Sequence, residues 1–198
     1  MPDRSYPGPG AQLRQQRVAR DFAAGFAGLT AARERARGWQ DFFRLYSDLV
    51  DWDIRLHEAG EAALGGSVRA LLAEVRRAFS ACVAREYEGW LDDGARPDVD
   101  RPILSVDVVR DRVLPLLDRT PVLFVVLDGR RLDQWRVLKP LLTRRFDLDE
   151  SLGSSILPTA TPYARNALFS GRFAEDFARE LPEGWERLEH GPNDFEDV

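Results

Sequence analysis

The stretch VLFVVLDG, Val122–Gly129, contains the six-residue apolar run that decides the fold class. The run is rich in β-branched residues and does not alternate polar and apolar side chains, which is typical of a strand buried on both faces of a parallel sheet. The sequence predicts a helix after it, over about Leu132–Arg145, and a second short strand near Ser154–Leu157. Another short helix is expected to follow Pro162. The order strand, helix, strand, helix predicts the opening of an α/β domain.

Three amphipathic helices are predicted upstream of this region. The first begins near Ala11, the second near Trp39, and the third has Ser67 as its expected N-cap and Gly94 as its expected stop. The third carries the clearest apolar stripe, at spacings of three and four: Val68, Leu71, Leu72, Val75, Phe79, Cys82, Val83, Tyr87, Trp90 and Leu91. A break before it is expected at three glycines: Gly60, Gly65 and Gly66. Short connections between such helices predict an antiparallel bundle.

The predicted fold class is therefore α plus α/β, with an N-terminal antiparallel helical bundle followed by the opening portion of an α/β domain. The turn-rich stretch 92–102 separates the helical region from the region with the α/β pattern. A short helix over roughly Val106–Leu117 follows this stretch. We expect residues 1–10 to be disordered, 11–118 to form the helical domain, and 119–198 to begin the α/β domain.

Composition narrows the class of protein. The chain has 198 residues, a net charge of -5 and 44% hydrophobic residues, the profile of an ordinary globular protein with no bias toward nucleic acid or anionic membranes. The single cysteine, Cys82, excludes a disulfide within the chain. No apolar run approaches the roughly 18 residues of a membrane span. We expect a cytoplasmic protein that does not contact a membrane.

Asp128 is the first candidate for chemistry. It lies at the carboxyl end of the predicted buried strand, where open α/β sheets bind their ligands. A carboxylate is a suitable ligand for zinc, manganese or magnesium. The alternative is that Asp128 caps the following helix or makes a local turn before Gly129.

Thr161 is the second candidate. Pro162 is favoured at the first position of a helix, which predicts Thr161 as the N-cap. Its hydroxyl could then accept a hydrogen bond from the helix backbone. It could instead point outward beside helix amides that bind a phosphate. A threonine hydroxyl needs a metal or a base to become a nucleophile, so Asp128 and Thr161 support each other as a site.

The histidines do not complete such a site. His57 falls in the second predicted helix and His190 near the C-terminus, and neither has metal-ligand spacing to other candidate ligands. The sequence contains no P-loop, no GxGxxG, no GxSxG and no HExxH motif.

Two longer stretches resemble a known family. FVVLDGRRLDQW, Phe124–Trp135, and SSILPTATPYARNALFSG, Ser154–Gly171, are similar to the PglZ-type branch of the alkaline phosphatase superfamily, as found in PorX-type response regulators. The helical half also resembles the bundle of those proteins, through DFFRLYSDLVDWDIRL and PILSVDVVRDRVLP.

The resemblance implies a site and an activity. Asp128 would be a ligand of a two-zinc site, and Thr161 the nucleophile that also touches metal, with Thr159 as the less favoured choice. The implied activity is metal-dependent hydrolysis of phosphate esters, with nucleotide or oligonucleotide phosphodiesters as substrates. Two-component signalling linked to type IX secretion is the implied setting, with a sensor kinase as partner of the full-length parent and a homodimer as a possible assembly.

The resemblance also implies parts that this sequence does not contain. A receiver domain would precede the bundle, and further Asp and His ligands would follow the last residue, so we expect a fragment that is inactive by itself. Two alternatives stay open: a non-catalytic helical module for dimerisation or partner binding, and a PglZ relative from a phage-defence system.

Overall fold

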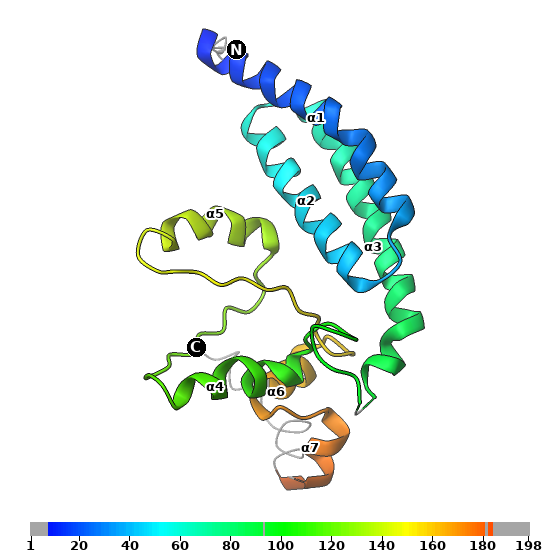
Figure 1. Ribbon diagram of the computed structural model, residues 1–198, viewed down its shortest axis with the longest axis vertical. Coiled ribbons are helices and arrows are strands. Elements are labelled where there is room, and N and C mark those ends of the chain that lie inside the picture. Colours follow the sequence, from blue (N-terminus) through cyan, green and yellow to red (C-terminus); the bar gives the residue numbers. More distant parts are fainter. Residues whose placement is uncertain (1–7, 93, 181, 184–198) are drawn as a thin grey trace. The chain divides into compact units, whose positions relative to one another are not determined.

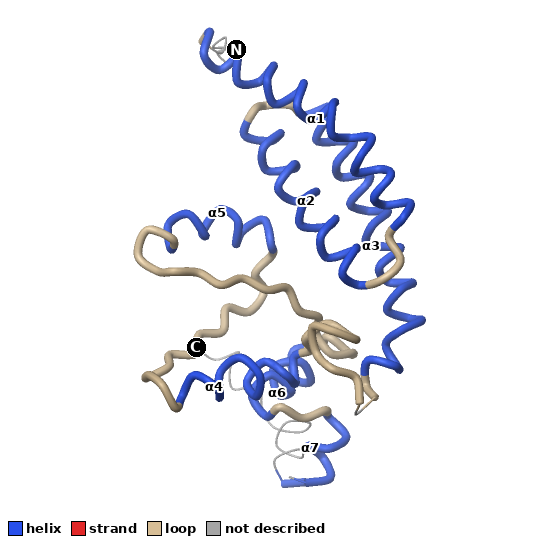
Figure 2. Tube along the Cα trace, in the orientation of Figure 1, coloured by secondary structure: helices blue, strands red, loops and turns tan. Residues whose placement is uncertain are grey.

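The computed structural model describes residues 8–92, 94–180, 182 and 183, which lie in helices, turns and loops (Figure 2). They form two compact units, each traced by two segments of the chain. Unit 1 combines residues 1–91 with 127–150, and unit 2 combines residues 92–126 with 151–198. His190 and most of the segment predicted to be disordered, residues 1–7, fall outside the described residues.

Unit 1 is built on the three predicted helices. They are α1 (Pro9–Arg35), α2 (Trp39–Glu58) and α3 (Ala62–Trp90), joined by short connections and packed antiparallel (Figure 1). We call α1–α3 the helical bundle. A fourth helix, α5 (Leu132–Leu142), packs against α2 in the same unit. The predicted bundle is confirmed.

The core of the bundle follows the predicted apolar stripes. Leu49, Leu56 and Val68 are fully buried, and each such side chain contributes roughly 1.5–3 kcal/mol to stability. Aromatic side chains link the helices, with ring centroids 5.2 Å apart between Phe22 and Trp52. The stripe of α3 is buried or half-buried except for Leu91, which is exposed at the end of the helix.

The helix ends correct two details of the sequence prediction. α3 begins at Ala62, so Ser67 lies inside the helix and is not its N-cap. Gly60 does separate α2 from α3, because its positive φ of 77° is a left-handed conformation that suits glycine. Gly65 and Gly66 instead continue α3, with Gly65 buried in the bundle.

Unit 2 is assembled around short helical segments. The predicted helix at 106–117 is a 3₁₀ turn (Ser105–Asp107), a π-helical turn (Val109–Val113) and α4 (Leu114–Leu117). α6 (Thr161–Ser170) packs on the first of these turns, and α7 (Ala174–Glu180) packs on α6. The small core contains Ile103, Leu104, Val106, Ile156 and Ala167.

The predicted strands are not formed in the described part of the chain. Residues 122–127 form a loop without sheet pairing, and Leu123 is 87% exposed. Near the second predicted strand, one bridge joins Leu104 to Ser154, with the Ser154 amide 2.8 Å from the Ile103 carbonyl. The α/β half of the predicted fold class is therefore not confirmed, because a strand exists only where a neighbouring backbone pairs with it.

Gly153 allows the close backbone approach at this bridge. A Cβ atom at this position would lie 2.9 Å from the Ile103 carbonyl oxygen, which is closer than carbon and oxygen normally approach. The glycine therefore lets residues 153–156 lie against residues 103–105.

Candidate functional site

Asp128 lies in an exposed turn of unit 1, directly after the apolar run. Its Oδ1 atom accepts a hydrogen bond from the Gly129 amide at 2.7 Å, and Gly129 has a positive φ of 68°. The N-cap of α5 is Arg131, so Asp128 is not the cap of that helix. Among the described residues Asp128 forms no ion pair, which leaves its carboxylate uncommitted to a cation of the chain.

Thr161 is the first residue of α6 in unit 2. The predicted N-cap role is wrong, because the cap is Ala160, whose carbonyl accepts hydrogen bonds from the amides of Tyr163 and Ala164. Pro162 occupies the first turn, where its missing N–H costs nothing. Thr159 is exposed in the loop before the helix. Asp128 and Thr161 thus belong to different units, each at a helix start or just before one.

The described residues contain no cluster of three or more His, Cys, Asp or Glu side chains that could hold a metal ion. Asp128 is one exposed carboxylate of the kind that zinc accepts. His57 lies in the second helix, as predicted, and it is exposed on α2.

A polar cluster that the sequence did not indicate joins α5 to α2. Arg136 of α5 donates a hydrogen bond to Ser47 Oγ and lies 2.9 Å from Asp51 Oδ1 through its Nε atom. The Nε–H bond is not directed at that oxygen, so the Asp51 contact is an ion pair and not a hydrogen bond. Glu150 accepts from Arg136 Nη1 at 2.5 Å and from the Trp135 indole N–H, and its other ion pair is to Lys139 at 3.2 Å. We call these residues the Arg136 cluster.

The partners of Glu150 in this cluster lower the pKa of its carboxyl group. The hydrogen bond from Trp135 lowers it most, burial opposes that effect, and the bonds from Arg136 and Lys139 lower it further. Together they lower the pKa of Glu150 from its ordinary 4.5 to about 2. The carboxylate is therefore ionised at neutral pH and holds the segment after α5 against that helix.

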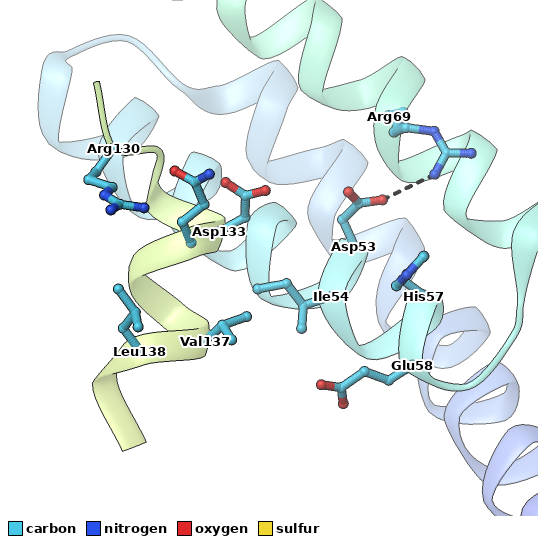
Figure 3. Close-up of a pocket in the computed structure, with 10 residues that line it drawn as sticks. Asp53, Ile54, His57, Glu58, Arg69, Arg130, Asp133, Val137 and Leu138 are labelled. Carbon is cyan, nitrogen blue, oxygen red and sulfur yellow. Dashed lines mark hydrogen bonds and ion pairs between the residues drawn. The ribbon is translucent and has the colours of Figure 1, made fainter. Parts of the chain in front are cut away.

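A groove of about 540 Å³ lies between α2 and α5 in unit 1 (Figure 3). Its apolar lining comes from Ile54 on α2 and from Val137 and Leu138 on α5. Five charged side chains and one histidine surround these: Asp53, Glu58, Arg69, Arg130, Asp133 and His57. Arg69 of α3 forms an ion pair with Asp53 at 3.3 Å, so part of this charge is neutralised within the bundle.

A second network that the sequence did not indicate is buried in unit 2. Asp107 is 1% exposed and accepts hydrogen bonds from both Nη atoms of Arg101, from the Leu104 amide at 2.8 Å and from Arg110 at 2.7 Å. Burial favours the neutral acid, but the bonds from Arg101 and Leu104 and the charge of Arg110 outweigh it, and the pKa of Asp107 is lowered. The available signal was the acidic residue Asp107 three positions after Leu104, since an acidic side chain at the third position of a helical turn commonly accepts a hydrogen bond from the N-cap amide.

Comparison with known families assigns both parts of the chain. Residues 12–91 match the PorX response regulator linker domain, and residues 108–183 match the BREX system PglZ alkaline phosphatase-like domain. The chain is of the PorX type. A search of the curated proteins found no match.

The two matches cover different parts of this PorX-type chain. The linker match covers α1–α3, which form the helical bundle. The PglZ match contains both Asp128 and Thr161, and also α5, which packs on the bundle in unit 1. None of the helices in the described residues is long and apolar enough to cross a membrane.

Proposed function

We propose that the chain is part of a PorX-like response regulator whose PglZ domain is a metal-dependent phosphohydrolase or phosphodiesterase. The observation that carries the proposal is the PglZ match over residues 108–183, directly after a PorX linker domain. The matched segment contains both candidate site residues, the carboxylate of Asp128 and the hydroxyl of Thr161.

In this proposal Asp128 and Thr161 would hold zinc. The exposed, unpaired carboxylate of Asp128 fits this role. Zinc supplies positive charge that lowers the pKa of a bound hydroxyl and stabilises negative charge on phosphoryl oxygens. Thr161 Oγ1 would then lose its proton to solvent and attack the phosphorus atom, and the alcohol of the ester would leave with a proton from solvent. Water would next attack the phosphothreonine ester, which would release the phosphate product and restore the Thr161 hydroxyl. The remaining ligands would come from residues that the structure does not describe.

The biological setting is proposed on the same basis. A sensor kinase would act on the full-length regulator, which would be a homodimer in the cytoplasm and function in signalling linked to type IX secretion. Nucleotide or oligonucleotide phosphodiesters would be its substrates. Genes for secretion next to the coding sequence would support this setting, whereas neighbouring phage-defence genes would support the other PglZ context.

The test combines metal content with hydrolysis of bis-p-nitrophenyl phosphate by the full-length protein. We expect bound zinc and turnover, and we expect Thr161→Ala to reduce turnover to background while Thr159→Ala keeps it. Asp128→Asn should reduce the zinc content, because an amide is a weaker ligand than a carboxylate. A full-length protein without metal or turnover would contradict the proposal.

One observation favours a second candidate, a non-catalytic interaction module. Val137, Leu138, Leu141 and Leu142 of α5 are exposed, although α5 is otherwise held to the bundle by charged groups. Exposed apolar side chains on a helix are typical of a surface that binds another protein. In this case the full-length protein would be inert, and Leu141→Glu would dissociate a dimer seen by light scattering.

A further inference from the structure

The Arg136 cluster connects the linker match to the PglZ match within unit 1. Ser47 and Asp51 lie one turn apart on the same face of α2, inside the linker match. Arg136 and Glu150 lie inside the PglZ match. The guanidinium group of Arg136 therefore holds a helix of one family segment against a helix of the other.

Burial and partner number distinguish this contact from an ordinary surface ion pair. The Arg136 side chain is 17% exposed and contacts three groups, Ser47 Oγ, Asp51 and Glu150. Isolated exposed ion pairs contribute little, but a partly buried arginine with several fixed acceptors forms a network whose loss leaves polar groups unsatisfied. Arginine suits the position because its planar group can reach acceptors on two elements at once.

The position of Asp128 follows from the position of α5. Asp128 precedes the first residue of α5, Leu132, by four residues, and within this connection the Gly129 amide donates a hydrogen bond to Asp128 Oδ1. The Arg131 amide donates to Gln134 Oε1 at 3.1 Å, and Leu132 packs against the bundle core. Asp128 is thus tied by a short, internally bonded segment to a helix that Arg136 fixes.

We propose that Arg136 is a positioning residue, which fixes the Asp128 carboxylate relative to the linker bundle by holding α5 on α2. This inference rests on the proposed function, because it gives the linker domain a direct part in placing a metal ligand of the PglZ domain. Leu132 adds an apolar contact with the bundle core, but it is a small one, so a movement of the linker could release the charged contact without exposing a large apolar surface.

The experiment compares Arg136→Ala with Arg145→Ala in this chain. Arg145 is exposed, lies in the same PglZ match and forms no ion pair among the described residues, so it is the matched control. Spin labels on Arg130→Cys and Glu74→Cys report the distance from the Asp128 turn to the bundle. Cys82 should react slowly with the label, because the residue is 1% exposed and burial raises the pKa of its thiol to about 11.

We expect Arg136→Ala to broaden the distance distribution and to speed amide exchange across Leu132–Leu142 about tenfold, the effect of losing one charged hydrogen bond. Arg145→Ala should change neither. Arg136→Lys should give an intermediate result, since lysine cannot contact three groups in this fixed geometry. Zinc affinity of the full-length protein, measured by calorimetry, should fall with Arg136→Ala.

Each outcome decides a separate point. An unchanged distance distribution in Arg136→Ala would overturn the inference. A broadened distribution with unchanged zinc affinity would also overturn it, because Asp128 would then not depend on Arg136 as a ligand. A wild-type protein without zinc would contradict the proposed function, and the distance measurement alone would then decide whether Arg136 fixes the turn. If Arg136→Ala fails to fold, Asp51→Asn removes the exposed partner and tests the same contact.

Discussion

At the scale of single residues, the buried Asp107 carboxylate is the most sensitive point of unit 2. It accepts hydrogen bonds from Arg101, from the Leu104 amide and from Arg110. Arg101 is itself only 8% exposed. Asp107→Ala would leave that guanidinium buried without its partner. We expect the free energy of unfolding to fall by about 3–5 kcal/mol, measured by urea denaturation.

The control for this prediction is Asp111→Ala. Asp111 also pairs with Arg110, at 2.6 Å, but it lies in the next helical turn and its side chain is 32% exposed. Its loss should cost less than about 1 kcal/mol, as for other exposed ion pairs. If the two substitutions lowered the free energy of unfolding equally, the burial of Asp107 would not add to its contribution to stability.

At the scale of elements, Glu150 predicts how the attachment of α5 responds to pH. The folded-state pKa of about 2 is below the ordinary 4.5, so the ionised group stabilises the folded state above pH 4.5. That contribution is lost as the pH falls from 4.5 toward 2. We expect amide exchange of α5, corrected for its intrinsic pH dependence, to speed up over this range. Glu150→Gln should exchange faster at pH 7 and should lose the acid transition.

The helices could be predicted from the sequence because their signal is local. Apolar residues at spacings of three and four placed α1, α2 and α3, and the structure confirms them. The start of α3 was missed because Gly65 and Gly66 resemble a break, whereas tertiary packing keeps Gly65 buried inside the helix. The run 122–127 has a strand pattern, but pairing depends on a second segment that no local pattern supplies.

The candidate site could be predicted only in part for the same reason. The apolar run and the Thr-Pro sequence indicated Asp128 and Thr161. Thr161 does lie at the start of α6, but the strand that was expected to end at Asp128 is not formed. The cap prediction for Thr161 failed because the backbone of Ala160 reaches the first helix amides. The Arg136 cluster was missed because Ser47 and Arg136 are 89 residues apart in sequence, and no short motif connects them.

At the scale of the whole molecule, the compact units and the family matches divide the chain differently. The PglZ match begins at residue 108 and includes α5, but α5 belongs to unit 1 with the linker bundle. The chain crosses between units after residues 91, 126 and 150. The predicted domain limits at 118 and 119 follow the change from a helical to a strand-like sequence pattern. They stay a prediction about the complete domain.

This difference leads to a prediction about cooperativity. Leu49 is fully buried in the bundle, and Leu49→Ala should cost unit 1 about 2–5 kcal/mol. Because the core of unit 2 is a separate set of residues, Leu49→Ala should speed native-state amide exchange in α1–α3 and α5 but not in residues 101–113. Asp107→Ala should do the reverse. Peptide-resolved hydrogen exchange on both variants measures this, with Leu13→Ala, at an exposed leucine, as the control. If α5 instead follows residues 101–113, the family match and not the packing on α2 defines the cooperative unit, and the positioning role of Arg136 would lose its structural basis.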